Sequence, residues 1–224
     1  MLRIREGSAL AGAGAIAFSV FAAPVSVVSL VVQSAPGGTY SESDVANYVS
    51  IGFLPTVIVT SYLALAGVLG LICVLAYLRE VVGVEPGSKL AASVFWGAGL
   101  AAAASIAVSW GLLAGIAVAA AEGGSAASVP HPVIYVLSDT SKNVLFGSGG
   151  ILLGFALIAL MLASRGQLPN WLRWLTLVVG VLAIASPALF PAFAIPIWGI
   201  VIGVWLIAAG RASRSATVTT QRGA

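Results

Sequence analysis

The sequence predicts an all-α membrane protein, a bundle of six transmembrane helices whose N- and C-termini both lie in the cytoplasm. Three observations predict this fold. Hydrophobic residues make up 60% of the 224 residues and charged residues only 8%, whereas soluble domains have about 45–50% and about 25%. Six apolar stretches are long enough to cross a bilayer, which takes roughly 17–25 residues per helix. Basic residues, finally, gather on alternate connections between these stretches.

The composition excludes several classes of protein. Ten Lys/Arg and seven Asp/Glu residues are too few to cover a water-facing surface, so the chain is neither a cytosolic enzyme nor a secreted disulfide scaffold. Its net charge of +3 is interpreted as basic residues beside lipid headgroups, and we expect no nucleic-acid partner. Cys73 is the single cysteine and lies in an apolar stretch, so we expect no intrachain disulfide.

The first three predicted spans are residues 9–32, 51–78 and 90–121. The first span follows a basic start, as a signal peptide does, but its apolar stretch exceeds the usual length of about 7–15 residues. Pro24 also follows the best cleavage point, so we expect a retained helix with a kink at Pro24. The third span is longer than a bilayer needs and must therefore tilt or stand out into water.

The last three predicted spans are residues 144–163, 171–187 and 192–210. Arg173 is the one charged residue within the six stretches, and its long stem lets the guanidinium reach the headgroups. Pro187 and Pro191 separate the fifth span from the sixth, because a proline lacks an N–H and disfavours helix at the residue before it. We expect a tight turn between them at the membrane surface.

The distribution of basic residues decides the orientation. With six spans, nine of the ten basic residues fall on one side of the membrane and Lys142 alone falls on the other. Cytoplasmic connections carry the excess of Lys and Arg, so the first side is the cytoplasm. Merging the last two spans would weaken this division to six against four. We therefore expect a multi-pass protein of the bacterial cytoplasmic membrane.

A single domain, residues 1–210, contains all six spans. The connections between the spans are too short to build a core of their own. The remaining residues, 211–224, are polar and basic without periodicity. We expect this tail to be disordered and to rest on anionic headgroups.

Small residues provide the surfaces on which these helices would pack. Glycines spaced four apart let two helices approach closely in lipid. Such pairs occur in the third, fourth and sixth spans, at Gly111/Gly115, Gly150/Gly154 and Gly199/Gly203. They serve either packing within the bundle, which we favour, or association with a second copy of the chain.

Polar side chains gather on the two exoplasmic connections, residues 33–50 and 122–143. Long structured loops in compact domains are often functional. The candidate interaction surface consists of Glu42, Asp44, Glu122, His131 and Asp139. A serine followed three residues later by an acid, as at residues 41–44, is typical of a helix start. A histidine near carboxylates is favoured in its charged form, so we expect binding by this surface to change as the pH falls toward about 6.

A second candidate site lies inside the predicted bundle. Thr56, Thr60, Ser61 and Tyr62 form the most polar patch within a span, and Trp110 lies in the next span. Together they would line a cavity for a small uncharged ligand. Hydrogen bonding between helices around Pro55 is the alternative explanation of the patch, and the one that we favour.

No motif indicates catalysis or a cofactor. Residues 12–17 match G-x-G-x-x-A, but they lie in an apolar helix and lack the preceding strand and the later acid that dinucleotide binding requires. His131 is the only histidine, which excludes a two-histidine haem site and an HExxH zinc site. The acids near it lack the spacing of metal ligands. We therefore expect no enzyme activity, no cofactor and no metal.

The second half of the chain, residues 144–209, resembles a family of uncharacterised bacterial six-span membrane proteins classed as a domain of unknown function. The similarity consists of three features. The first is an acid and a glycine-rich segment at the entry to the fourth span, which comprise Asp139, Gly147, Gly149 and Gly150. The others are the link into the fifth span, with Arg165, Leu168, Pro169, Trp171 and Leu172, and the last span, with Pro196, Trp198 and Gly203. The first half is similar only in helix count and in the placement of its connections. The resemblance implies the six-span architecture and no particular site residue.

Two hypotheses of function follow. The leading one is a non-enzymatic structural, accessory or sensory membrane component that contacts a membrane-protein partner or a second copy of itself. The alternative is a binder or facilitative carrier of a small apolar or lipidic ligand within the bundle. The absence of carboxylates and histidines inside the spans argues against proton-coupled transport.

Overall fold

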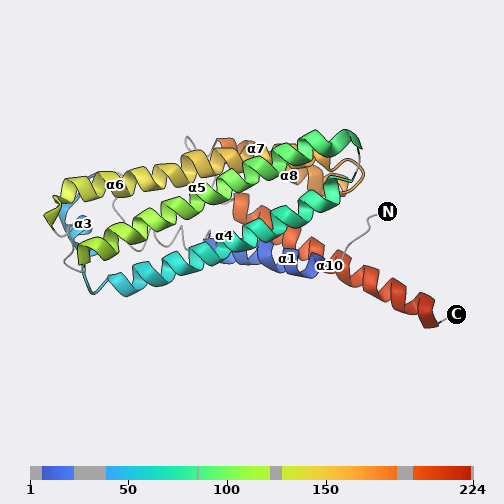
Figure 1. The fold of residues 1–224 in the computed structure, drawn as a ribbon, viewed down its shortest axis with the longest axis horizontal. Coiled ribbons are helices and arrows are strands. Elements are labelled where there is room, and N and C mark those ends of the chain that lie inside the picture. Colours follow the sequence, from blue (N-terminus) through green and yellow to red (C-terminus); the bar gives the residue numbers. More distant parts are fainter. Residues whose placement is uncertain (1–6, 23–38, 85, 122–127, 186–193, 223–224) are drawn as a thin grey trace.

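The structure is a computed structural model that describes residues 7–22, 39–84, 86–121, 128–185 and 194–222. These residues form helices joined by turns, and no strand occurs among them (Figure 1). The helices are α1 (Ser8–Ala17), which continues as a π-helical turn to Ala22, α3 (Glu42–Tyr48), α4 (Leu54–Val82), α5 (Lys89–Ala121), α6 (His131–Asn143), α7 (Gly150–Ala163), α8 (Asn170–Ile184) and α10 (Ala194–Arg222). The all-helical fold class is thereby confirmed.

Four helices are long and apolar enough to cross a membrane: Leu54–Val82, Lys89–Ala121, His131–Ala163 and Ala194–Ala212. This supports a membrane protein. The first and fifth predicted spans correspond to shorter apolar helices, Ser8–Phe21 and Asn170–Ile184. The rest of the first span with Pro24, and the turn containing Pro187 and Pro191, lie outside the described residues. Six crossings therefore stay a prediction.

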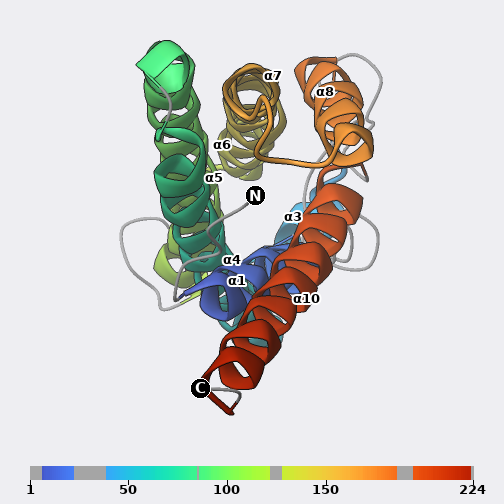
Figure 2. The ribbon, with the colours of Figure 1, turned by 90° about the vertical axis from the view of Figure 1, so that its right-hand side faces the viewer.

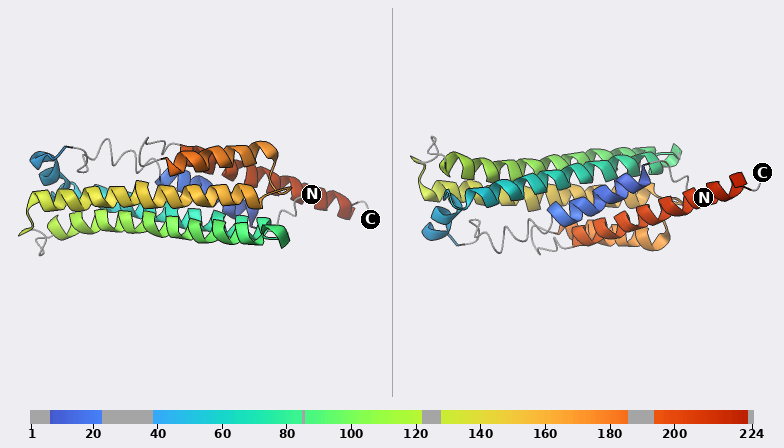
Figure 3. Two further views of the ribbon diagram at one scale, coloured as in Figure 1. Left: turned by 90° about the horizontal axis from the view of Figure 1, so that it is seen from above. Right: turned by 90° about the horizontal axis from the view of Figure 1, so that it is seen from below.

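The helices follow one another around the bundle in chain order. Each of α1, α4, α5, α7, α8 and α10 packs against the next, and α10 closes the ring by packing against α1 (Figure 2). The two described chain ends lie at the same end of the bundle as the turns at residues 83–88 and 164–169, which we call the turn end (Figures 1 and 3). The opposite end carries α3, and we call it the α3 end.

The connection predicted at residues 122–143 is helical over much of its length, which corrects its description as a loop. Helix begins at His131 and continues through a π-helical segment, residues 144–149, to Ala163. The polar residues on α6 made it resemble a loop, but three of the four buried positions are polar: Ile134, Ser138, Ser141 and Lys142. Their spacing of four, three and one places them on one helical face, against α5.

The tail is the second correction, because α10 continues as helix to Arg222. Neither proline nor glycine occurs between Gly210 and Gly223 to end it. The polar and basic composition of residues 211–222 therefore marks the part of α10 beyond the apolar stretch rather than a disordered tail. In Figure 1 this part extends away from the bundle at the turn end.

Glycines bring the backbones of neighbouring helices together at two crossings of α1. A Cβ atom on Gly12 would lie 2.6 Å from the carbonyl oxygen of Gly203 on α10, and one on Gly14 would lie 2.8 Å from that of Gly70 on α4. The glycines that match a dinucleotide motif are therefore helix-packing residues. Gly154 makes a similar approach to Gly180 on α8.

The glycine pairs divide between the two uses that the sequence left open. Gly154 and Gly203 serve contacts inside the bundle, whereas a Cβ atom on Gly111 or Gly115 would meet nothing within 4 Å. Packing within the bundle thus accounts for the pairs of the fourth and sixth spans. The pair of the third span faces open space.

Candidate functional site

The short helix α3 is fixed at the α3 end by a cap and a buried tyrosine. The Ser41 hydroxyl accepts a hydrogen bond from the Asp44 backbone N–H at 3.4 Å, so the predicted helix start at residues 41–44 is present. Tyr48, 3% exposed, donates to the Leu113 carbonyl of α5 at 2.5 Å. Burial raises the pKa of Tyr48, so its hydroxyl stays protonated and keeps this bond.

Two predicted site residues from separate segments meet at this end. His131 Nδ1, on the first residue of α6, contacts the Glu42 carboxylate at the start of α3. Tyr40 donates its hydroxyl to the same carboxylate, and its ring packs edge-on against Tyr135 with centroids 5.5 Å apart. We call Tyr40, Glu42, His131 and Tyr135 the α3–α6 cluster.

The charge of the cluster centres on Glu42. The hydrogen bond from Tyr40, followed by that from His131, lowers the pKa of Glu42 below its ordinary value, and the same Glu42 contact raises the pKa of Tyr40. Glu42 is therefore ionised and Tyr40 neutral near pH 7, in the states that suit an acceptor and a donor. The cluster is solvent-accessible, since the His131 and Glu42 side chains are 33% and 66% exposed.

The other residues of the predicted surface lie elsewhere. Asp44 is exposed on α3, two residues from Glu42 and so turned to another side of the helix. Asp139 lies about two turns along α6 from His131, where its carboxylate accepts a bond from Asn143 at 3.2 Å. Glu122 lies outside the described residues. The structure thus brings together one acid and the histidine, and not the whole predicted set.

The intramembrane patch of α4 does not converge on one point. Thr60 donates to the Thr56 carbonyl at 2.7 Å, a bond within its own helix. Tyr62 is 72% exposed, whereas Ser61 is buried at 5%. Trp110 on α5 is buried at 3%. The hydroxyl of Ser61 and the indole nitrogen of Trp110 are buried without a hydrogen-bond partner.

Reciprocal hydrogen bonds join α5 to α6 farther into the bundle. The Ser109 hydroxyl donates to the Ser141 carbonyl at 2.6 Å, and the Ser141 hydroxyl donates to the Ser109 carbonyl at 2.7 Å. Both serines are fully buried, and neighbouring Lys142 is only 8% exposed. The sequence did not identify Ser141 and Lys142 as buried residues. Their helical spacing with Ile134 and Ser138 is the signal that would have found them.

Tryptophans occupy both buried and surface positions. Trp198 of α10 is completely buried and donates its indole N–H to Thr176 of α8 at 3.0 Å. Trp171 and Trp174, at the start of α8, are 55% and 65% exposed at the turn end. Exposed tryptophans at a helix end are typical of the membrane interface.

The described residues contain no group of three or more His, Cys, Asp or Glu side chains that could hold one metal ion. Comparisons of the chain with protein-family models, with curated proteins and with solved structures found no match.

Proposed function

We propose that the chain is a non-enzymatic component of a bacterial cytoplasmic membrane whose α3 end contacts another membrane protein. In this proposal the chain crosses the membrane six times with both termini in the cytoplasm. The turn end then lies at the cytoplasmic headgroups and the α3 end is exoplasmic. The resemblance to bacterial six-span proteins belongs to the same proposal.

The length of the central helices is the observation that carries the proposal. Lys89–Ala121 and His131–Ala163 each have 33 residues, which corresponds to about 50 Å at ~1.5 Å per residue. A hydrocarbon core is only about 30 Å thick. With Lys89 at the cytoplasmic headgroups, the core ends near Ser109, about 30 Å along α5. The bonded pair of Ser109 and Ser141, with Lys142 beside it, then lies at the exoplasmic boundary.

The part of α6 beyond this boundary carries an apolar stripe. Val133, Val136 and Leu137 are 46%, 58% and 49% exposed. Their spacing of three and four residues places them on one face of the helix. Exposed apolar surface outside the hydrocarbon core is typical of a protein contact, and the α3–α6 cluster holds the start of this helix against α3. We therefore take this face of α6 as the contact surface.

Site-specific crosslinking in intact cells tests the proposal. A photoreactive residue at Val136 is expected to form a protein adduct, whereas one at Val178 of α8, which is 53% exposed, is expected to contact lipid alone. Glu42→Gln and His131→Ala should each reduce the Val136 adduct, because they loosen α3 from α6. Asp44→Asn removes the same charge from an exposed position of α3 and serves as the control.

Three outcomes decide between the explanations. A protein adduct at Val136 that depends on Glu42 and His131 supports the proposal. An adduct with a second copy of this chain would replace the foreign partner by a homo-oligomer. Lipid adducts alone at Val136, under every growth condition, would show that this face is a bilayer surface and would end the proposal.

The alternative function, binding or carrying a small ligand within the bundle, has one observation in its favour. Ser61 Oγ and Trp110 Nε1 are buried polar atoms without a hydrogen-bond partner, and a ligand carrying a hydroxyl or carbonyl group would satisfy them. Native mass spectrometry of the purified chain tests this. A bound small molecule that disappears in Trp110→Phe would favour the carrier, and the same ligand-free mass in both chains would oppose it.

A further inference from the structure

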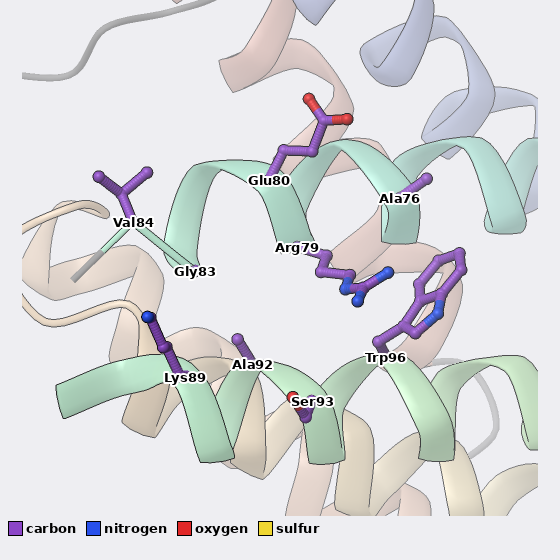
Figure 4. Close-up of a pocket in the computed structure, with 9 residues that line it drawn as sticks. All are labelled: Ala76, Arg79, Glu80, Gly83, Val84, Lys89, Ala92, Ser93 and Trp96. Atoms are coloured by element: carbon purple, nitrogen blue, oxygen red, sulfur yellow. The ribbon is translucent and has the colours of Figure 1, made fainter. Parts of the chain in front are cut away.

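A groove opens between α4 and α5 at the turn end, far from the α3–α6 cluster. It has a volume of about 630 Å³ and is lined by residues of both helices and of the turn between them: Ala76, Arg79, Glu80, Gly83, Val84, Lys89, Ala92, Ser93 and Trp96 (Figure 4). The lining combines two cations, one carboxylate, a hydroxyl and an indole. No residue of the predicted sites contributes to it.

Arg79 is positioned within the groove by an aromatic face. Its guanidinium carbon lies 5.3 Å from the centroid of the Trp96 ring, a cation–π arrangement. Figure 4 shows Arg79 directed from α4 toward Trp96, with Lys89 on the facing wall and the Glu80 carboxylate directed to the other side of α4. Stacking occupies the face of the guanidinium and leaves its N–H edges available for an anion.

The turn between α4 and α5 positions Arg79 and Lys89 on facing walls of the groove. The Ser88 hydroxyl donates to the Val82 carbonyl at 2.6 Å, and the Gly83 N–H donates to the Arg79 carbonyl at 2.9 Å. A Cβ atom on Gly83 would lie 2.9 Å from that carbonyl oxygen, so the close turn depends on glycine. Lys89 then begins α5, where the helix N-terminus adds partial positive charge.

We propose that this groove binds the phosphate of an anionic phospholipid headgroup. Arg79 and Lys89 contact the phosphate oxygens, and the Ser93 hydroxyl donates a hydrogen bond to one of them. The Trp96 ring stacks against the Arg79 guanidinium and holds it in place. An arginine fork and a lysine are the side chains that recognise phosphate most strongly.

Apolar surface beside the groove indicates a lipid as the source of the phosphate. Val84 lines the groove and is 61% exposed, and Leu69, about two turns from Ala76 on the same face of α4, is 65% exposed. Acyl chains attached to a headgroup in the groove would cover both, whereas a free phosphate would leave them bare. The groove also lies where α4 ends and α5 begins, the level at which a membrane helix meets the headgroups.

Lipid binding to the full chain in detergent tests the proposal. Native mass spectrometry with added phosphatidylglycerol is expected to show one retained lipid, and phosphatidylcholine should be retained poorly. Arg79→Gln and Lys89→Gln should each weaken phosphatidylglycerol retention about fivefold. Arg165→Gln removes the same charge from an exposed position in the other turn of this end and should bind like the wild type. Trp96→Leu should weaken binding while leaving the net charge unchanged.

The remaining outcomes are equally decisive. Lys89 is exposed at the first residue of α5, so Lys89→Gln is expected to fold and carries the test if Arg79→Gln unfolds. Equal losses in Arg165→Gln and Lys89→Gln would mean diffuse attraction to charge and would overturn the proposal. Equal retention of phosphatidylcholine would do the same. Inorganic phosphate that displaces the lipid at millimolar concentration would identify a soluble phosphate as the ligand and overturn the lipid assignment.

Discussion

Glu42 joins α3 to α6 by accepting hydrogen bonds from Tyr40 and His131, and these bonds lower its pKa. A lowered pKa means that the folded state favours the ionised form. Its contribution to stability is therefore fully present above the ordinary value of 4.5 and is lost as the pH falls through the lower folded-state value. Acidification should therefore weaken the contact between α3 and α6, at a pH below the range in which histidine usually titrates.

The first prediction concerns this acid dependence. Spin labels at Asn47 and Val136, both exposed, in a Cys73→Ser chain should give a narrow distance distribution at pH 7. The distribution should broaden as the pH falls below 4.5, because protonated Glu42 is a weaker acceptor. Glu42→Gln should be broad at every pH, and Asp44→Asn should follow the wild type. A Glu42→Gln distribution as narrow as that of the wild type would contradict the assigned role of Glu42.

The second prediction concerns the reciprocal bonds of Ser109 and Ser141. Replacing both by alanine should lower the free energy of unfolding by about 1–2 kcal/mol, since hydrogen bonds between membrane helices contribute about 0.6 kcal/mol on average and up to about 1.7. Ser105→Ala is the matched control on α5, because Ser105 is half-buried and its hydroxyl donates within the same helix, to the Ala101 carbonyl at 3.0 Å. Unfolding in detergent, followed by circular dichroism, measures both. Equal losses in the control and the double variant would contradict the prediction.

The sequence predicted the α3–α6 contact only in part, for a physical reason. Glu42 and His131 were both candidates, but they lie 89 positions apart, and nothing in one sequence brings Glu42 rather than Asp139 to His131. Arg79 and Trp96 illustrate the same limit. Each is an ordinary interfacial residue by itself, and only the antiparallel pairing of α4 with α5 places one over the other.

Apolar content predicted the central helices better than their ends. The expected span at residues 90–121 is nearly the whole of α5, Lys89–Ala121. A helix can extend beyond its apolar stretch where its polar residues pack against another helix, as those of α6 pack against α5. Apolar content alone does not indicate such packing. The same limit applies to α10, where helix passes the end of the apolar stretch without a residue that would stop it.

The third prediction tests how α1 is held between α4 and α10. Gly203→Leu should destabilise the bundle by about 2 kcal/mol or more, because the new side chain meets the Gly12 backbone and overpacking costs about 1–3 kcal/mol. Gly115→Leu makes the same substitution where nothing lies within 4 Å. It should stay within about 0.5 kcal/mol of the wild type. Thermal unfolding measures both, and a Gly115→Leu chain that loses as much would contradict the packing, or reveal a contact between two copies of α5.

The order and direction of the helices around the ring determine which chain ends and turns lie at the same end of the bundle. Because α1 runs antiparallel to both α4 and α10, with Gly12 near Gly203 and Gly14 near Gly70, the described chain ends and both turns share one end. The chain therefore passes from the turn end to the α3 end before α4 begins. Likewise, α8 starts at the turn end and α10 returns to it. This arrangement fits the predicted six crossings, with α1 before the helices Leu54–Val82, Lys89–Ala121 and His131–Ala163, and with α8 and α10 after them.

The fourth prediction uses this relation to test the topology. Reporter fusions after Gly210 and within residues 164–169 should both report the cytoplasm, and a fusion within residues 122–130 should report the exoplasmic side. If only the four long helices crossed, the C-terminus would lie on the side of residues 122–130, opposite the 164–169 turn. The fusion at 164–169 is thus the internal control that separates six crossings from four. A C-terminal reporter on the exoplasmic side would overturn the six-span arrangement, and a cytoplasmic reporter within residues 122–130 would overturn the assignment of the α3 end as exoplasmic.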